Sequence, residues 1–114
     1  ITCRDWSSDV CSSDLMENDV KIQQITHPYL EQISEIFDES SCVSIERDME
    51  MVYIDVYTGR GRALMSRQRI GNTAPMHCTG NGKLCLLNYS EEQLDRLIRQ
   101  RGLPQLTEYT LTTK

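Results

Sequence analysis

The sequence predicts an α+β fold in which an antiparallel sheet is packed by helices. Three observations in the 114 residues support this prediction. Apolar residues recur every three or four positions between residues 22 and 37, their period changes to two between residues 43 and 57, and a capped helical pattern follows residue 90. The length and the ordinary share of hydrophobic residues, 39%, indicate one domain with a modest core.

The first fifteen residues stand apart from this pattern. Asp5–Asp14 shows no helix or strand periodicity, and its ten residues resemble the translation of a common sequencing-adapter end, with Leu15 completing the next codon. We therefore expect residues 1–15 to be adapter-derived and disordered, and Met16 to be an internal residue of the natural protein. The alternative is a genuine disordered tail rich in Ser and Asp.

Residues 16–38 predict two consecutive helices. Steps of three and four place five apolar residues on one helical face: Ile22, Ile25, Tyr29, Ile33 and Ile36. Because proline lacks an N–H and clashes inside a helix but fits a first turn, Pro28 is expected to end one helix near Thr26. A second helix would then run from Pro28 to about Asp38.

Residues 43–57 predict an antiparallel hairpin with one buried face. Arg47–Glu50 is a short polar turn, and the apolar residues on either side alternate with polar ones: Val43, Ile45, Val52, Ile54 and Val56. After Gly59 and Gly61, Ala63–Arg69 is expected to form a third strand.

The next segment predicts a loop followed by a short helix. Ile70–Gly82 is punctuated by glycine and proline, which indicates a loop. Lys83–Asn88 is apolar nearly all round, so we expect a buried helix whose entry lies near Gly80.

A second C-terminal helix is predicted from its start and stop signals. Ser90 and Gln93 have the spacing of a capping box, an apolar period follows, and Gly102 and Pro104 end it. In Thr107–Lys114, Thr112 is placed like the N-cap of a further helix, and the chain ends two residues later.

Charge and cysteine content exclude several classes of protein. The net charge of −5 disfavours a chain that itself holds nucleic acid, because phosphate neutralisation needs clustered Lys and Arg. Setting aside Arg4 and the aspartates Asp5, Asp9 and Asp14 lowers the counts from 12 basic and 17 acidic residues to 11 and 14. No apolar run approaches a membrane span, and no secretory signal is present. Beyond residue 15 an odd number of cysteines indicates free thiols in a reducing cytoplasm: Cys42, Cys78 and Cys85.

The Gly-rich stretch Ile70–Lys83 is the candidate ligand site. A strand that passes through a loop into a helix presents free N–H groups at the helix start, where a carboxylate or phosphate binds. Gly80 and Gly82 would let a ligand approach the main chain closely. The alternative is that these glycines serve only the tight packing of a strand-to-helix turn.

Other chemistries in this region are less favoured. His77 and Cys78 could act as base and nucleophile, but sequence neighbours rarely face each other and no third group orients them. A zinc site drawn from His27, His77, Cys78 and Cys85 lacks a C-x-x-C pair, and Cys85 is expected to be a buried structural thiol. Four arginines favour a solvated sheet edge over an anion site: Arg60, Arg62, Arg67 and Arg69.

Several segments, in order, resemble the IclR family of bacterial transcriptional regulators. They are His27–Glu31, Val52–Asp55, Ile70–Gly71 with Ala74–Lys83, and Leu86–Leu87 with Ser90–Glu92. The family's loop typically reads Gly, a Pro with an apolar neighbour, His, a small residue, Thr or Ser, Gly, any residue, Gly and Lys. The similarity runs from about His27 to Lys114.

The resemblance implies a GAF-like fold that is incomplete in this chain. In the family an N-terminal winged helix-turn-helix binds DNA, a linker helix follows, and a GAF-like domain binds a small effector. Residues 16–27 would be the linker helix and residues 28–114 the N-terminal half of the effector-binding domain. The DNA-binding domain would then lie before Met16 and the C-terminal half beyond Lys114.

The resemblance also implies an effector site, carried over residue by residue. Gly80 and Asn81 would offer backbone amides, with Ala74, Met65 and Ser66 as pocket walls. Many members have a small residue where Asn81 stands and a larger apolar one where Ala74 stands, which suggests a more polar ligand and a wider pocket. The implied effector is a small organic acid or aromatic compound, bound without a cofactor.

The implied partners follow from the same family. DNA would be contacted only through the missing N-terminal domain, no membrane is involved, and the full-length cytoplasmic protein would be a homo-oligomer. Two functions stay open: a sensing module of a DNA-binding regulator, and a stand-alone GAF-like small-molecule-binding domain that never touches DNA. A helix-turn-helix pattern upstream would favour the first. An enzyme using Cys78 is less favoured than either.

Overall fold

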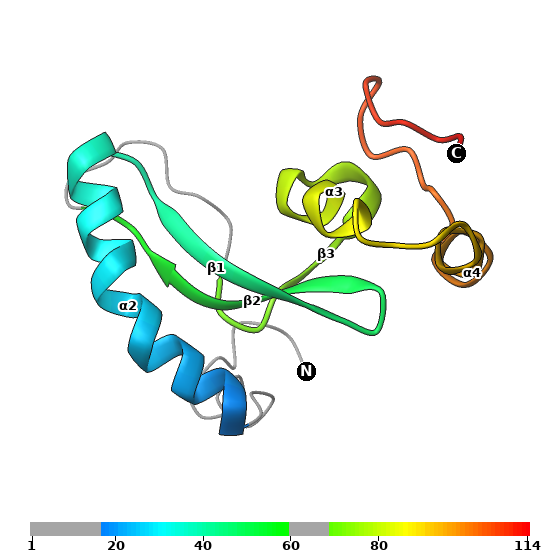
Figure 1. The fold of residues 1–114 in the computed structure, drawn as a ribbon. Coiled ribbons are helices and arrows are strands. Elements are labelled where there is room, and N and C mark those ends of the chain that lie inside the picture. Colours follow the sequence, from blue (N-terminus) through cyan, green and yellow to red (C-terminus); the bar gives the residue numbers. More distant parts are fainter. Residues whose placement is uncertain (1–16, 60–68) are drawn as a thin grey trace, which may run out of the picture. The chain divides into compact units, whose positions relative to one another are not determined.

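The computed structural model describes residues 17–59 and 69–114 (Figure 1). Its elements are, in chain order, α2 (Glu17–Phe37), β1 (Ser41–Arg47), β2 (Glu50–Tyr57), β3 (Thr73–Pro75), the 3-10 turn η2 (Met76–Cys78), α3 (Gly80–Leu86) and α4 (Glu91–Arg101). The strands of these residues form one sheet in the order β1-β2-β3. The α+β prediction is therefore confirmed, and the predicted hairpin is present. The third strand predicted at 63–69 falls almost entirely outside the described residues.

The chain divides into two compact units, which we describe separately. Among the described residues, the first contains 17–45, 52–59 and 69–72, and the second contains Glu46–Met51 together with Thr73–Lys114. The first unit thus holds α2 and most of the hairpin, and the second holds the hairpin tip, β3, η2, α3 and α4.

In the first unit α2 is one helix, so the predicted break at Pro28 is wrong (Figure 1). A proline at this position removes the hydrogen bond to the carbonyl of Gln24. Gln24 and Pro28 are both exposed, so water can satisfy that carbonyl. On another side of the helix, Leu30 and Ser34 are buried and anchor the part of the helix that follows the proline.

Two serine hydroxyl groups form hydrogen bonds between α2 and the segment that leads into β1. Ser34 Oγ donates to the carbonyl of Glu39 at 2.6 Å, and Ser41 Oγ donates to the carbonyl of Leu30 at 2.7 Å. The helix itself ends at Phe37, followed by Asp38 in the left-handed region with φ 53°. Its end therefore agrees with the prediction to within one residue.

The apolar face predicted for α2 is exposed rather than buried. The buried residues of the helix are Asp19, Leu30 and Ser34. The five apolar residues that share the predicted face are exposed: Ile22, Ile25, Tyr29, Ile33 and Ile36. The periodicity identified the helix correctly, but it did not identify the face that packs within this chain.

The prediction of a single buried face is wrong for β2. Met51 to Asp55 are buried without alternation, although Tyr53 and Asp55 were expected on the solvent side. The physical reason is that β2 is the central strand of the sheet order, so it is paired along both edges, and the Asp55 side chain is covered by His27 of α2 at 2.8 Å. Backbone pairing continues from Tyr53 to the segment before β3, where its N–H donates to Asn72 at 3.0 Å and its carbonyl accepts from Gly71 at 2.7 Å.

The tip of the hairpin is a two-residue turn of Asp48 and Met49, as the short polar connection predicted. Both residues are left-handed, with φ 51° and 62°, which is the type I′ geometry that matches strand twist. Arg101 at the end of α4 donates to the carbonyl of Asp48 from Nη2 at 2.6 Å and pairs with Glu50 at 3.6 Å. These contacts hold a turn that contains no glycine.

The core of the second unit is a cluster of three buried residues. Met51, Met76 and Leu97 are each 3% exposed or less, and they bring together the hairpin tip, η2 and α4. Six partly buried residues pack around them: Met49, Ala74, Cys85, Leu86, Tyr89 and Leu103. Burial raises the pKa of the Tyr89 hydroxyl, and the neighbouring Glu46 carboxylate raises it further.

The two C-terminal helices differ in how well the sequence predicted them. Ser90 caps α4 with a complete capping box, and the helix ends at Gly102, as predicted. By contrast α3 spans Gly80–Leu86 instead of residues 83–88, and it is not buried all round, because Leu84 is 67% exposed. The predicted loop 70–82 contains β3 and η2, each too short to show a period.

Among the described helices, none combines the length and apolar character needed to cross a membrane.

Candidate functional site

The segment from β3 to α3 forms a compact turn closed by its own side chains. Pro75 has an extended conformation (φ −63°, ψ 141°) and precedes η2. Its carbonyl accepts a hydrogen bond from Thr79 Oγ1 at 2.9 Å, and Cys78 Sγ lies 3.7 Å from the same oxygen. Thr79 is extended and leads directly into α3. The Pro–Met–His–Cys–Thr sequence therefore builds a rigid entry to the helix.

Gly80 and Asn81 are the first two residues of α3, which agrees with the predicted helix entry. Gly80 is exposed, and a Cβ at this position would meet no atom within 4 Å. Asn81 Oδ1 accepts a hydrogen bond from the N–H of Gly82 at 3.0 Å. The N–H of Lys83 donates to the carbonyl of Thr79 at 2.9 Å, so a main-chain donor for an acidic group would come from the very start of the helix, at Gly80.

Gly82 has a packing role that differs from the one expected. A Cβ at this position would stand 2.4 Å from both Cα and the carbonyl oxygen of Met76. Gly82 is buried and permits α3 to lie directly on η2. Of the two glycines expected to let a ligand approach, only Gly80 has open space at the position of a side chain.

The remaining predicted site residues lie elsewhere. Ala74 is in the middle of β3 and packs against the Met51–Met76–Leu97 cluster, together with Cys85 and Leu86 of α3. Ala74 and α3 thus meet at the same cluster. Met65 and Ser66 lie outside the described residues, as do three of the four arginines, Arg60, Arg62 and Arg67.

His77 and Cys78 have separate backbone partners. The buried His77 places Nε2 2.9 Å from the carbonyl of Pro104, which ties η2 to the segment after α4. Cys42, Cys78 and Cys85 are free thiols, all partly buried, so Cys85 is less buried than expected. In the two described ranges, no group of three His, Cys, Asp or Glu side chains is placed to hold a metal ion.

A polar cluster in the first unit was not predicted. Asp55 of β2 is 1% exposed, and its Oδ2 lies 2.8 Å from Nδ1 of the half-exposed His27 of α2. The His27 ring meets the ring of Tyr57 edge-on at 5.9 Å, and the Tyr57 hydroxyl donates to Glu31 at 3.4 Å. The only signal in the sequence was a lone Asp within an apolar strand, which the alternation assigned to the solvent side.

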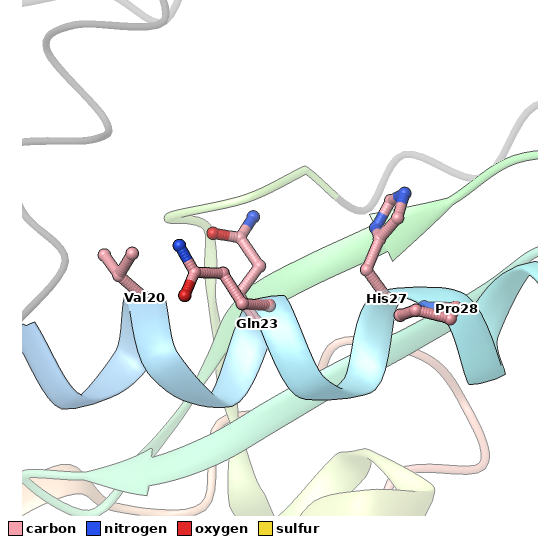
Figure 2. A pocket seen from close by; sticks show the side chains of 5 residues that line it. Val20, Gln23, His27 and Pro28 are labelled. Carbon is pink, nitrogen blue, oxygen red and sulfur yellow. The ribbon is translucent and has the colours of Figure 1, made fainter.

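Beside this cluster lies a hollow of about 400 Å³ along α2. Figure 2 shows Val20, Gln23 and His27 pointing to the same side of the helix. Gln24 and Pro28 complete the lining. The hollow is wide open to solvent, whereas small-molecule sites usually enclose most of the ligand. A second hollow of about 270 Å³ lies in the other unit, between Met49, His77 and Arg101.

Comparison with known proteins gives a consistent result. The family described as "Bacterial transcriptional regulator IclR C-terminal" matches residues 16–114. The transcriptional repressor IclR of Escherichia coli (strain K12) is 34% identical over 91 residues, which is 78% of this chain and 33% of the repressor. The chain therefore spans about a third of the length of the curated relatives it matches.

Two solved structures share the fold. The Thermotoga maritima IclR structure has a TM-score of 0.70 at 27% identity, over 81% of this chain and 37% of that chain. An IclR homolog from Microbacterium hydrocarbonoxydans, complexed with 4-hydroxybenzoate, has a TM-score of 0.72 at 17% identity, over 82% and 38% of the two chains. This second similarity concerns the fold alone.

Proposed function

Because the chain belongs to the IclR family of bacterial transcriptional regulators, we propose that residues 16–114 serve in sensing a small effector that modulates operator binding by the whole regulator. The single observation that carries the proposal is the family match, which covers all residues after the first fifteen. Residues 16–27 are proposed as the linker segment and residues 28–114 as part of the effector-binding domain. The continuous α2 joins these two segments without a break.

We propose that DNA contact is made outside these residues, by a helix-turn-helix domain that precedes them. The 11 basic and 14 acidic residues of 16–114 give a net charge of −3, which supports this division, since phosphate contacts need clustered basic residues. The chain's relatives are transcriptional repressors rather than enzymes. The proposed location is the cytoplasm, where a bacterial regulator meets DNA, and the proposed assembly is a homo-oligomer.

The proposed effector is a small organic acid or an aromatic compound. One structural neighbour is complexed with 4-hydroxybenzoate, an aromatic carboxylate. Such a group suits the entry to α3, where Gly80 leaves the main chain open to an approaching acceptor. Asn81 would add a polar contact, while Ala74, Met65 and Ser66 are proposed as walls.

The site is tested by titrating the full-length protein calorimetrically. A panel of small carboxylates, including 4-hydroxybenzoate, is first screened by thermal shift, and the best binder is then titrated. Gly80→Val should fold, because a Cβ at this position meets nothing within 4 Å, but it should weaken binding about tenfold or more by blocking the approach to the main chain. Cys78→Ser is the matched control and should bind as the parent does.

The opposite result is equally clear. If Gly80→Val unfolds at the parent's temperature and binds the same ligand equally well, the ligand lies elsewhere. The proposed residues Gly80 and Asn81 would then be wrong, although a sensing function could still be served by another site.

A further inference from the structure

The outer face of α2 carries an apolar stripe formed by five side chains: Ile22, Ile25, Tyr29, Ile33 and Ile36. Exposure reaches 67% for Ile25, 62% for Tyr29 and 74% for Ile36. Single exposed apolar residues are ordinary, but a continuous stripe over four helical turns indicates an interaction surface. We call these five residues the α2 stripe.

The α2 stripe is palindromic about its middle residue. Its steps are three, four, four and three, so Ile22 and Ile36 stand seven positions on either side of Tyr29, and Ile25 and Ile33 stand four positions on either side. The types read the same in both directions. A two-fold interface requires that if residue i contacts residue j, then j contacts i. Two copies of this helix can meet this requirement when they run antiparallel with Tyr29 opposite Tyr29.

The charges beside the stripe favour the same arrangement. Lys21 and Glu35 lie fourteen positions apart, near opposite ends of the stripe and on the same flank of the helix. In an antiparallel pair centred on Tyr29, Lys21 of each copy lies near Glu35 of the other copy. A parallel pair would not bring these two charges together. Lys21 now pairs with Glu17 at 3.2 Å, but both side chains are well exposed, so this pair is weak and can exchange.

We propose that a second copy of the chain docks on the α2 stripe, with the two α2 helices antiparallel across a two-fold axis at Tyr29. This rests on the homo-oligomer named under the proposed function and specifies its surface. Ile22 of each copy packs against Ile36 of the other, Ile25 against Ile33, and the two Tyr29 rings meet at the axis. The buried side of α2, with Leu30 and Ser34, faces its own sheet and is not used.

The geometry is tested by cysteine cross-linking of the full-length protein. Ile22→Cys and Ile36→Cys are prepared separately, with tags of different size, and are oxidised mildly alone and after mixing. The mixture should give a disulfide-linked heterodimer. Ile22→Cys alone should stay at the level of the parent, because the two introduced thiols would be about 21 Å apart along the paired helices, too far for a disulfide. The same holds for Ile36→Cys alone. Tyr29→Cys should cross-link with itself, and Gln24→Cys, on the polar face, should not.

Other outcomes would overturn the proposal. Self-linking of Ile22→Cys would show parallel helices, and no linking above the parent in any variant would show that something else covers the stripe, such as another segment of the same polypeptide. Far-UV circular dichroism confirms that each variant is folded. Effector binding, measured on the same samples, shows whether the sensing function stands independently of this interface.

A charge exchange tests the antiparallel pairing without changing the stripe. Lys21→Glu alone should weaken self-association roughly threefold to thirtyfold, because each dimer then holds two like-charged pairs in place of two opposite ones. Lys21→Glu combined with Glu35→Lys should restore it, as measured by sedimentation equilibrium. Failure of the double variant to recover would contradict the proposed register.

Discussion

Gly80 and Gly82 stand two residues apart in α3, and they differ in what surrounds them. At Gly80 a side chain would enter open space, whereas at Gly82 a Cβ would come within 2.4 Å of the Met76 backbone. The sequence alone makes the two equivalent, because both lie in one Gly-rich stretch. The two differ because η2 lies against α3 at Gly82 and not at Gly80. Gly82 is therefore needed for packing, while Gly80 leaves the main chain accessible.

Alanine substitutions should therefore have opposite effects at these positions. Gly82→Ala should destabilise the full-length protein by about 1–3 kcal/mol, because the backbone of η2 must move. Gly80→Ala should be neutral or stabilising by up to about 1 kcal/mol, since alanine favours the helix and meets no clash. Urea unfolding of both variants measures the difference. An equal decrease in the free energy of unfolding for both variants would disprove the packing role assigned to Gly82.

Cys42 offers a test that depends on pH. Burial raises the pKa of its thiol, so at a given pH the folded protein holds less thiolate than an ordinary cysteine. The stabilising effect of the protonated thiol is complete below the pKa in the unfolded chain and is lost as the pH rises through the higher pKa of the folded state. We expect Cys42 to be alkylated more slowly at pH 8 in the native protein than in denaturant. Mass spectrometry of the modified peptides measures the rates, and equal rates would contradict the burial.

Helix starts and ends could be predicted from nearby residues, whereas the surfaces against which each helix and strand packs could not. The capping box at Ser90 depends on residues three positions apart, and it was predicted in full. The continuous helix at Pro28 and the buried Asp55 depend on packing with distant residues, which no local period reveals. The same limit applies to Ala74: its place in a three-residue strand follows from pairing within the sheet.

The contact between His27 and Asp55 is the clearest link between α2 and β2. His27→Phe removes the partner of a carboxylate that is 1% exposed. The substitution should lower the free energy of unfolding by about 1–3 kcal/mol. His27→Phe combined with Asp55→Leu should recover most of the loss, because an apolar pair replaces a buried polar one. Chemical denaturation of the parent, both single variants and the double variant gives the coupling between the two sites. If the change in unfolding free energy of the double variant equals the sum of the changes in the single variants, the two side chains do not interact.

At the scale of the whole molecule, the family match begins at residue 16, directly after the segment that resembles a sequencing adapter. Fold class and family were both predictable, because each is carried by short segments whose pattern can be recognised locally. For the proposed effector residues, the sequence could predict only their place along the chain. Gly80 and Asn81 lie where expected at the start of α3, while Met65 and Ser66 fall outside the described residues.

The first fifteen residues are tested on the source DNA. Amplifying the gene across the codons around Met16 should yield a reading frame without Asp5–Leu15. Upstream codons should specify a helix-turn-helix with a basic recognition helix. Finding Asp5–Leu15 encoded in the gene would disprove the adapter interpretation, and a different upstream domain would favour a small-molecule-binding module that never touches DNA.

We propose that effector sensing by this domain is coupled to DNA binding by the whole regulator. The most direct measurement is fluorescence anisotropy of labelled operator DNA titrated with the full-length protein, with and without a saturating effector. We expect the effector to change the affinity for DNA by about 5- to 150-fold, and the DNA to change the affinity for the effector by the same factor. An effector that binds tightly but leaves the DNA affinity unchanged would contradict the claim.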